Sequence, residues 1–244
     1  MIATHRGRNT DFRENTIPSF DHALKLGCEA VECDLRLTLD SRVVVNHGAN
    51  VGSNRQEVAI SKTLLRDLSH ERLLTIEELF DYIDLKDVPF YLELKNSSAV
   101  LVEKVVSRIK DGNLWERVHI IGFSFFIGSA VAAQSKYPKL KVVQLITIPL
   151  YSYVKKPHSS YGVALGWFDG WPGTRWLFRR LISVERLVKL RELYEKNGFS
   201  RVMAGVINNK FDFEYFDQAG ITDIITDNVI GAVDYFKSDK RKTC

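Results

Sequence analysis

Residues 30–37 read Ala-Val-Glu-Cys-Asp-Leu-Arg-Leu, a mostly apolar stretch of the length and character of a buried strand. Side chains alternate between the two faces of a strand, so Glu32 and Asp34 point the same way. Cys33 should point to the opposite face, toward covering helices, as a core thiol. Burying two carboxylates on one face is costly unless a cation or a hydrogen-bond donor meets them.

A second strand of the same kind is predicted at residues 89–95, which end in Tyr-Leu-Glu-Leu-Lys. Glu93 and Lys95 lie two positions apart and share a face. An early His5-Arg6 pair adds two more polar residues at the end of a short apolar stretch. We therefore expect these charged groups to neutralise one another or to hold a metal ion.

Apolar stretches alternate with helical patterns along the whole chain. The predicted strands are 2–5, 30–37, 89–95, 117–124, 141–147, 161–167, 201–208 and 223–227. The predicted helices are 18–26, 76–83, 99–110, 128–137, 184–197, 213–219 and 229–237. Near-continuous apolar strands separated by helices indicate a parallel sheet. Eight of them in 244 residues predict one (β/α)₈ TIM barrel, a single catalytic domain spanning 1–244. An open doubly wound sheet is the alternative, but no Gly-x-Gly-x-x-Gly follows the first strand.

An extra strand-like stretch, residues 43–47, follows the second strand after a turn at residues 39–42. We place this hairpin above the barrel rim. The charged residues singled out above lie at or near the ends of the first three predicted barrel strands. Active sites of such barrels are built at the carboxyl ends of the strands, so these residues are expected at one mouth.

Composition excludes several classes of protein. The net charge of +4 comes from 34 basic and 30 acidic residues, and the only dense basic stretch is 237–242, so no nucleic-acid partner is expected. Cys28, Cys33 and Cys244 form no Cys-x-x-Cys pair and suit a reducing compartment. We expect no signal peptide, and the longest apolar stretch, 142–154, is too short to span a bilayer. The sequence therefore predicts a soluble, cytoplasmic protein.

Five motifs appear in a fixed order in the first 95 residues. They are His5-Arg6-Gly7, Glu14-Asn15-Thr16, Glu32-x-Asp34, His47 and Glu93-x-Lys95. This ordered set resembles the glycerophosphodiester phosphodiesterase family, and residues 224–227, Ile-Ile-Thr-Asp, resemble that family's last strand. From residue 100 to 220 the resemblance rests only on the alternation of strands and helices.

The resemblance implies a barrel enzyme that hydrolyses glycerophosphodiesters to glycerol phosphate and an alcohol with a divalent cation, Ca²⁺ or Mg²⁺. Its substrate would be a small-molecule phosphodiester. Carried over position by position, it assigns three kinds of role. Glu32, Asp34 and Glu93 match the metal carboxylates, His5 and His47 the acid–base histidines, and Arg6 and Lys95 the phosphate-contacting cations. The chain departs from the family at Gly48, where an aspartate usually follows the histidine, and in the short segment after it.

This chemistry is also reasonable on general grounds. Carboxylate oxygens suit Ca²⁺ and Mg²⁺, and a metal with two cationic side chains would neutralise charge that grows on a phosphodiester. One imidazole can accept the proton of the attacking oxygen while the other protonates the leaving alkoxide. The attacking oxygen is either water or the glycerol's own hydroxyl, by way of a cyclic phosphate; the sequence leaves both open.

Structural explanations stand beside these assignments. Glu32 and Asp34 could form a salt-bridge network with Arg36 or Lys95, and Lys95 could balance Glu93 without touching substrate. His47 could be a rim histidine without a role. Two alternative functions also remain: a lysophospholipase D that acts on lyso-lipids, and a catalytically weak phosphoester-binding protein.

Residues 167–180 hold three of the four tryptophans beside several arginines, after the sixth predicted strand. Aromatic and arginine side chains together suit a lipid–water interface or a binding lid. Peripheral lipid contact without membrane insertion is one interpretation. Packing of the rings against the edge of the barrel is the other, and the slightly favoured one.

Overall fold

Eight parallel strands close into a barrel, as the sequence predicts. The computed structural model of the chain describes residues 1–8, 11–52, 57–147, 161–168 and 172–237. The barrel strands are β1 (Ile2–His5), β2 (Ala30–Leu37), β7 (Phe90–Leu94), β8 (Val118–Phe123), β9 (Val142–Ile146), β10 (Gly162–Leu165), β11 (Arg201–Gly205) and β12 (Asp223–Thr226). Each pairs with the next along this list, and β12 and β2 both pair with β1, which closes the barrel.

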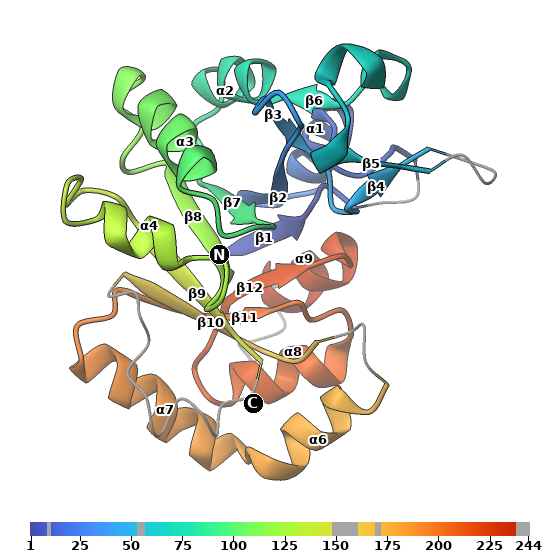
Figure 1. Ribbon diagram of the computed structural model, residues 1–244. Coiled ribbons are helices and arrows are strands. Elements are labelled where there is room, and N and C mark those ends of the chain that lie inside the picture. Colours follow the sequence, from blue (N-terminus) through green and yellow to red (C-terminus); the bar gives the residue numbers. More distant parts are fainter. Residues whose placement is uncertain (9–10, 53–56, 148–160, 169–171, 238–244) are drawn as a thin grey trace.

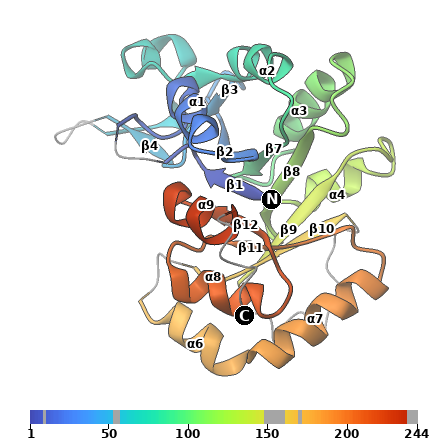
Figure 2. The ribbon, with the colours of Figure 1, turned by 180° about the vertical axis from the view of Figure 1, so that it is seen from behind.

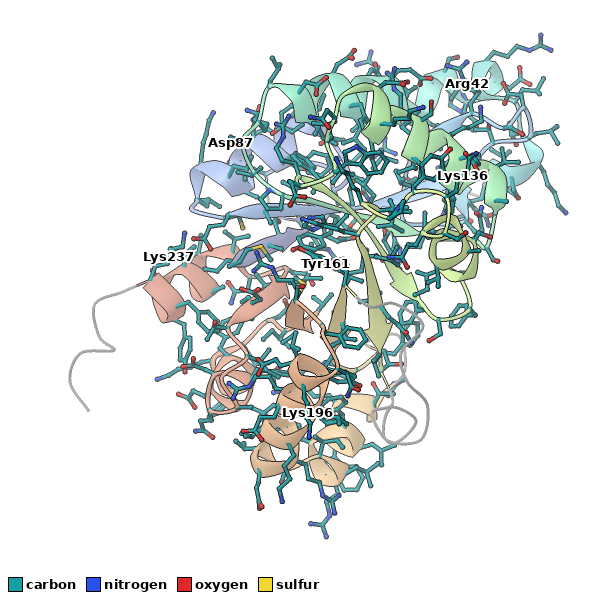
Figure 3. The ribbon with its side chains drawn as sticks, turned by 90° about the vertical axis from the view of Figure 1, so that its left-hand side faces the viewer. Arg42, Asp87, Lys136, Tyr161, Lys196 and Lys237 are labelled. Carbon is teal, nitrogen blue, oxygen red and sulfur yellow. The ribbon has the colours of Figure 1, made fainter. Side chains whose placement is uncertain are left out.

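Helices surround the barrel on its outside (Figure 1). They are α1 (Ile17–Lys25), α2 (Ile76–Asp84), α3 (Ala99–Asp111), α4 (Gly128–Ala133), α6 (Thr174–Leu181), α7 (Val184–Lys196), α8 (Lys210–Asp217) and α9 (Val229–Lys237). Charged side chains such as Arg42, Lys136 and Lys196 project at the periphery (Figure 3). Within the described residues, none of the helices has the length and apolar character needed to cross a bilayer.

One side chain from each strand contributes to the buried apolar layer of the barrel interior. These eight residues form a single buried cluster: Ala3, Ala30, Tyr91, Ile121, Val143, Ala164, Met203 and Ile225. Two larger clusters lie outside the strands, under the helices. Cys33 is fully buried in the first of these, on the helix-facing side of β2, as expected from its place between two inward carboxylates. Because alternate residues share a face, the next inward level is two residues further along each strand.

An insertion separates β2 from α2. Strand β3 (Val43–Val45) pairs antiparallel with the end of β2 and takes no part in the barrel, so the expected hairpin is present. The insertion continues through β4 (Asn50–Val51), β5 (Val58–Ala59), the 3₁₀ helices η1 (Ile60–Lys62) and η2 (Leu65–Glu71), and β6 (Leu74–Thr75). Figure 1 shows these elements projecting to one side of the barrel.

Several helix ends follow local rules. Thr75 and Glu78 form a capping box at the start of α2. The main differences from the predicted helices are at α4, which ends at Ala133, and at α8, which begins earlier, at Lys210. Asn209 accounts for the second difference, because its side chain accepts a hydrogen bond from the Asp212 amide and caps α8 there.

Candidate active site

A pocket of about 500 Å³ opens at the carboxyl ends of the barrel strands. The strand register brings His5 beside Glu32 and places Asp34 beside Glu93. His5, Glu32 and Glu93 stand two positions beyond the apolar interior cluster on their strands, and Asp34 stands four positions beyond it, all on the same inward face. Asp227 follows β12 and lines the same pocket. Barrel closure therefore gathers polar residues from both ends of the chain.

Three buried carboxylates form the floor of this polar side. Ligand oxygens of Glu32, Asp34 and Glu93 lie within 4.8 Å of one another. Glu32 is only 2% exposed, yet neither of its carboxylate oxygens has a hydrogen-bond partner among the described residues. Oε1 of Glu93 is likewise buried without a hydrogen-bond partner among the described residues. Burying an acceptor without a donor costs free energy, so a bound cation would stabilise this cluster.

Cationic side chains compensate part of this negative charge. Lys95 Nζ lies 3.0 Å from Asp34 Oδ1 and 2.8 Å from Glu93 Oε2. Arg6 Nε lies 3.2 Å from Asp34 Oδ2. Asn15 donates from Nδ2 to the same Asp34 oxygen over 2.8 Å. Asp34 is thus held by two ion pairs and one hydrogen bond, whereas no described residue donates a hydrogen bond to the Glu32 carboxylate.

The pKa values of the three carboxyls differ accordingly. Burial raises the pKa of Glu32 well above its usual value, and the neighbouring Asp34 and Glu93 raise it further. Burial also raises the pKa of Glu93, to about 7, against the opposing effect of Lys95. For Asp34 burial is outweighed: Lys95, Arg6 and the Asn15 hydrogen bond together lower its pKa to about 2. Without a further cation, the cluster does not hold three full negative charges near neutral pH.

These residues fit a divalent cation. The donor set is made only of oxygens, which is what Ca²⁺ and Mg²⁺ prefer. The unpartnered oxygens of Glu32 and Glu93 are buried and face the third carboxylate across distances that one ion can bridge. A divalent cation would satisfy those acceptors and would stabilise the ionised forms of both glutamates. Glu32, Asp34 and Glu93 are therefore the candidate metal ligands.

His5 is held by the last strand of the barrel. Its Nδ1 lies 2.7 Å from Asp227 Oδ1, and Asn208 donates to the other carboxylate oxygen, Oδ2, over 2.9 Å. Although burial raises the pKa of Asp227, the hydrogen bonds from His5 and Asn208 lower it overall, so the carboxylate is ionised and only accepts. His5 Nδ1 must then carry the hydrogen. Nε2, 3.9 Å from Glu32 Oε2, is the atom left to exchange a proton.

His47, which is carried by the insertion after β2, also lines the pocket. Arg36 fixes its backbone: Nε and Nη2 of Arg36 donate to the His47 carbonyl over 3.0 and 2.6 Å. Burial lowers the pKa of His47 to about 4, and the nearby cations Lys95 and Arg6 add to the effect. The imidazole is therefore neutral at pH 7. Arg36 thus braces the loop that carries His47, instead of pairing with the strand carboxylates.

The loop after β1 has an unusual backbone that presents Arg6 to the site. Arg6 and Gly7 both have a φ of 64°, in the left-handed region. A Cβ at Gly7 would lie 2.4 Å from Ser19 Oγ, so this position requires glycine. Arg6, although it is not a glycine, is held in this conformation while its side chain is nearly buried against Asp34. Backbone strain of this kind is typical of functional sites.

The other half of the pocket is apolar. Phe123, Leu145 and Ile146 line it from the ends of β8 and β9, and Trp167 and Phe168 line it from the segment after β10. Trp167 is buried, with its ring centroid 5.7 Å from that of Phe178 and 6.0 Å from that of Phe216. The pocket therefore joins a charged side, near β1, β2 and β7, to an apolar side near β8 to β10.

The structure brings all seven predicted site residues to one pocket or its immediate wall. His5, Arg6, Glu32, His47, Glu93 and Lys95 line it, and Asp34 lies directly behind Arg6 and Lys95. The roles of Asp227 and Arg36 were not predicted. Asp227 could have been found from its place after the last strand, which must lie beside the first in a closed barrel. Within residues 167–180, Trp167 packs inward and Trp176 is exposed, while Trp171 lies outside the described residues.

A closed (β/α)₈ barrel with a pocket, a buried carboxylate trio and two histidines at the carboxyl ends of its strands has the architecture of a barrel enzyme. The sequence matches the Glycerophosphoryl diester phosphodiesterase family over residues 5–230. The chain belongs to that family and is an enzyme of it.

Relatives agree with this assignment. The chain is 26% identical to a glycerophosphodiester phosphodiesterase of Caldanaerobacter subterraneus, over 93% of this chain and 94% of the relative. It is also 26% identical to a lysophospholipase D of Homo sapiens, but over only 45% of this chain and 41% of that protein. The second relationship covers about half of the barrel.

Solved structures share the fold. A phosphodiesterase of Oleispira antarctica, in complex with the product sn-glycerol-3-phosphate, superposes with a TM-score of 0.72 at 18% identity, covering 97% of this chain and 96% of that chain. A glycerophosphodiester phosphodiesterase of Thermotoga maritima has a TM-score of 0.67 at 22% identity, covering 94% and 95%. At these identities the likeness establishes the barrel and not the substrate.

Proposed function

We propose that this enzyme hydrolyses glycerophosphodiesters to glycerol phosphate and an alcohol with a divalent cation, Ca²⁺ or Mg²⁺. One observation carries the proposal: the buried carboxylates of Glu32, Asp34 and Glu93 share a pocket with two histidines and two cations. The single barrel domain holds all of these groups. A phosphodiester is an anion, and this pocket offers positive charge beside proton-transfer groups.

Charge stabilisation is divided among several groups. When bound, the cation acts as a Lewis acid on the phosphoryl group. Arg6 and Lys95 stand on the pocket side of Asp34 and would contact the phosphate oxygens. Asp34 fixes both cations in place before substrate arrives, which lowers the cost of organising them during the reaction.

Proton transfer is assigned to the two histidines. His5 exchanges a proton through Nε2, because Asp227 holds the hydrogen on Nδ1. His47 is neutral at pH 7 and is ready to accept a proton. Together they serve the attacking oxygen and the leaving alkoxide. The attacking oxygen is that of water or the glycerol hydroxyl, and trapping a cyclic glycerol phosphate would identify the second path.

A second candidate function is lysophospholipase D activity. The observation that favours it is the apolar half of the pocket, where Phe123, Leu145 and Trp167 would receive an acyl chain. Each buried methylene of such a chain contributes about 0.8 kcal/mol. The lysophospholipase D relative supports the same idea for that part of the chain. The phosphate chemistry would be unchanged.

A substrate panel tests both functions. Release of glycerol phosphate from glycerophosphocholine, glycerophosphoethanolamine and glycerophosphoglycerol is compared with choline release from a long-chain lysophosphatidylcholine, in the presence of Ca²⁺ or Mg²⁺. Turnover of the first group, lost in Glu32→Gln, supports the proposed function. Turnover of the lyso-lipid alone supports the second candidate. Binding of glycerophosphodiesters without any turnover would mean a phosphoester-binding protein and would overturn both.

A further inference from the structure

Exposed apolar side chains gather on the face of the barrel that holds the pocket. Ten of the twelve large exposed hydrophobic residues in the described part of the chain lie in the segments that lead from a barrel strand to the next helix, or in the first turn of that helix. They are Phe12, Leu39, Val58, Val100, Phe125, Phe168, Trp176, Leu177, Phe211 and Ile230. Only Leu85 and Leu193 lie elsewhere. Scattered apolar residues are ordinary on a surface, but their gathering on one face marks that face for contact with an apolar partner.

Helix α6 presents the densest part of this face. Trp176 and Arg180 are four residues apart and therefore share one side of the helix, and Leu177 lies next to them. Phe178 lies on the opposite side and is buried against Trp167 and Phe216. Trp176 is 69% exposed. Figures 1 and 2 show α6 at the outer edge of the molecule, where the longer α7 also lies.

The exposed side of α6 is connected to the pocket. The Thr174 hydroxyl donates to the Phe168 carbonyl over 2.6 Å, which ties the start of α6 to the pocket wall. The Phe168 ring lies 6.1 Å from Phe123, and Phe123 stacks on Phe125 at 5.5 Å. Phe125 is itself 67% exposed. We call Phe125, Phe168, Trp176, Leu177 and Arg180 the rim surface.

The charge beside the rim surface is positive. Arg175 and Arg179 both bind one buried carboxylate, Asp212, over 2.9 and 3.2 Å, so two positive charges share one negative charge. Arg180 has no carboxylate within ion-pair distance among the described residues. Among the described residues, the three arginines on two turns of this helix are thus balanced by ion pairs to a single carboxylate, that of Asp212. Such a surface attracts anions, and its aromatic and aliphatic side chains bury apolar area at the same place.

We propose that the rim surface docks this enzyme on the surface of an anionic lipid bilayer. Tryptophan with arginine on a short exposed helix suits the headgroup region, where the ring meets the acyl boundary and the cation meets lipid phosphates. The charge complementarity and the continuity with the pocket mouth favour a bilayer over a protein partner. Docking here would turn the pocket toward the membrane. The inference stands whether the substrate is a soluble diester or a lyso-lipid.

Vesicle flotation tests this proposal without reference to turnover. The wild-type protein is mixed with vesicles of phosphatidylcholine alone, or of phosphatidylcholine with phosphatidylglycerol, at low and at high salt. We expect binding to the anionic vesicles that weakens at high salt. Trp176→Ala/Leu177→Ala should bind about tenfold more weakly or worse, because two apolar side chains no longer enter the bilayer. Arg180→Glu should lose about fivefold or more on anionic vesicles.

Leu193→Ala, an exposed leucine on α7 away from the rim surface, is the matched control and should bind as the wild type does. Because the altered side chains are exposed, melting temperatures should stay unchanged. Hydrolysis of a soluble diester should also be unchanged in the double variant. The hydrolysis assay therefore tests the proposed function, and the flotation assay tests the docking, independently of each other. The proposal is overturned if the wild type does not bind anionic vesicles, if the double variant binds equally well, or if the face mediates self-association instead.

Discussion

His5 Nδ1 and Asp227 Oδ1 lie 2.7 Å apart, so the ends of the first and last barrel strands meet in a hydrogen bond inside the active site. The hydrogen bond that joins the first and last barrel strands therefore also orients His5, the proposed acid–base histidine. Asn208, which follows β11, extends this link by donating to Asp227 and by accepting from its backbone amide.

Asp227→Asn should lower kcat by at least about 100-fold, because an amide can donate to Nδ1 and stabilise the wrong tautomer of His5. The pH dependence of kcat should change as well, which a purely structural role would not cause. Steady-state kinetics across a pH series and a melting curve measure both. A loss below tenfold with an unchanged pH profile would remove Asp227 from its positioning role.

His5→Ala and His47→Ala should each lower kcat by about 10²–10⁴-fold while the fold is kept, since each removes one positioned proton-transfer group. His70→Ala is the control, because His70 is exposed on η2 and, among the described residues, forms an ion pair only with its neighbour Glu71. That control should keep full activity. If either site variant retains more than a tenth of the wild-type rate, that histidine is not an acid or base of the reaction.

Asn15→Ala should weaken binding of the divalent cation by about 10- to 100-fold, because Asn15 orients Asp34 through two hydrogen bonds. Titration calorimetry on the metal-free protein measures this without substrate. Asn50→Ala, an exposed asparagine on the insertion, serves as the comparison and should bind the ion normally. Equal affinities in both variants would show that Asn15 only shapes its loop.

His119 should make the protein less stable in acid. Burial lowers its pKa to about 4, aided by Lys141 and Arg201. A base whose pKa is lowered by folding contributes stability that is fully present above its unfolded pKa, about 6.5, and that is lost as the pH falls toward 4. This loss amounts to roughly 3 kcal/mol.

The matching variant is His119→Gln, which cannot gain a charge. Denaturant unfolding from pH 7 to pH 4 should show that the free energy of unfolding falls more in the wild type than in the variant. The difference in this free energy between the two proteins should therefore become smaller as the pH falls. If the difference in free energy of unfolding between the two proteins stays constant over this pH range, His119 does not titrate in the way its burial implies.

Much of the fold could be predicted from local patterns in the sequence. Strands β1 and β2 have the predicted bounds, because each is a short apolar stretch with clear breaks on both sides. Helix α6 was not predicted. Half of its sequence, TRWLFRRL, is threonine and arginine, and only Phe178 is buried within it. What holds it is distant in sequence: Asp212 on α8 binds two of its arginines.

The candidate site likewise combines features that could be predicted from local sequence with features that depend on the tertiary structure. Glu32 with Asp34, and Glu93 with Lys95, were predicted to converge because a strand's two-residue period is a local property. The hydrogen bond between His5 and Asp227 spans nearly the whole chain and depends on barrel closure. The bond from Arg36 to the His47 carbonyl depends on the antiparallel pairing of β2 with β3. Such contacts follow from tertiary structure and not from spacing.

The most direct test of the account is the initial rate of glycerol phosphate release from glycerophosphocholine after treatment with a chelator, followed by titration with Ca²⁺ or Mg²⁺. The account predicts no turnover in the chelated protein, full recovery with one of these ions, and no recovery in Glu32→Gln or Glu93→Gln at the same ion concentrations. Turnover that survives chelation, and is equal in both variants and in the wild type, would contradict it.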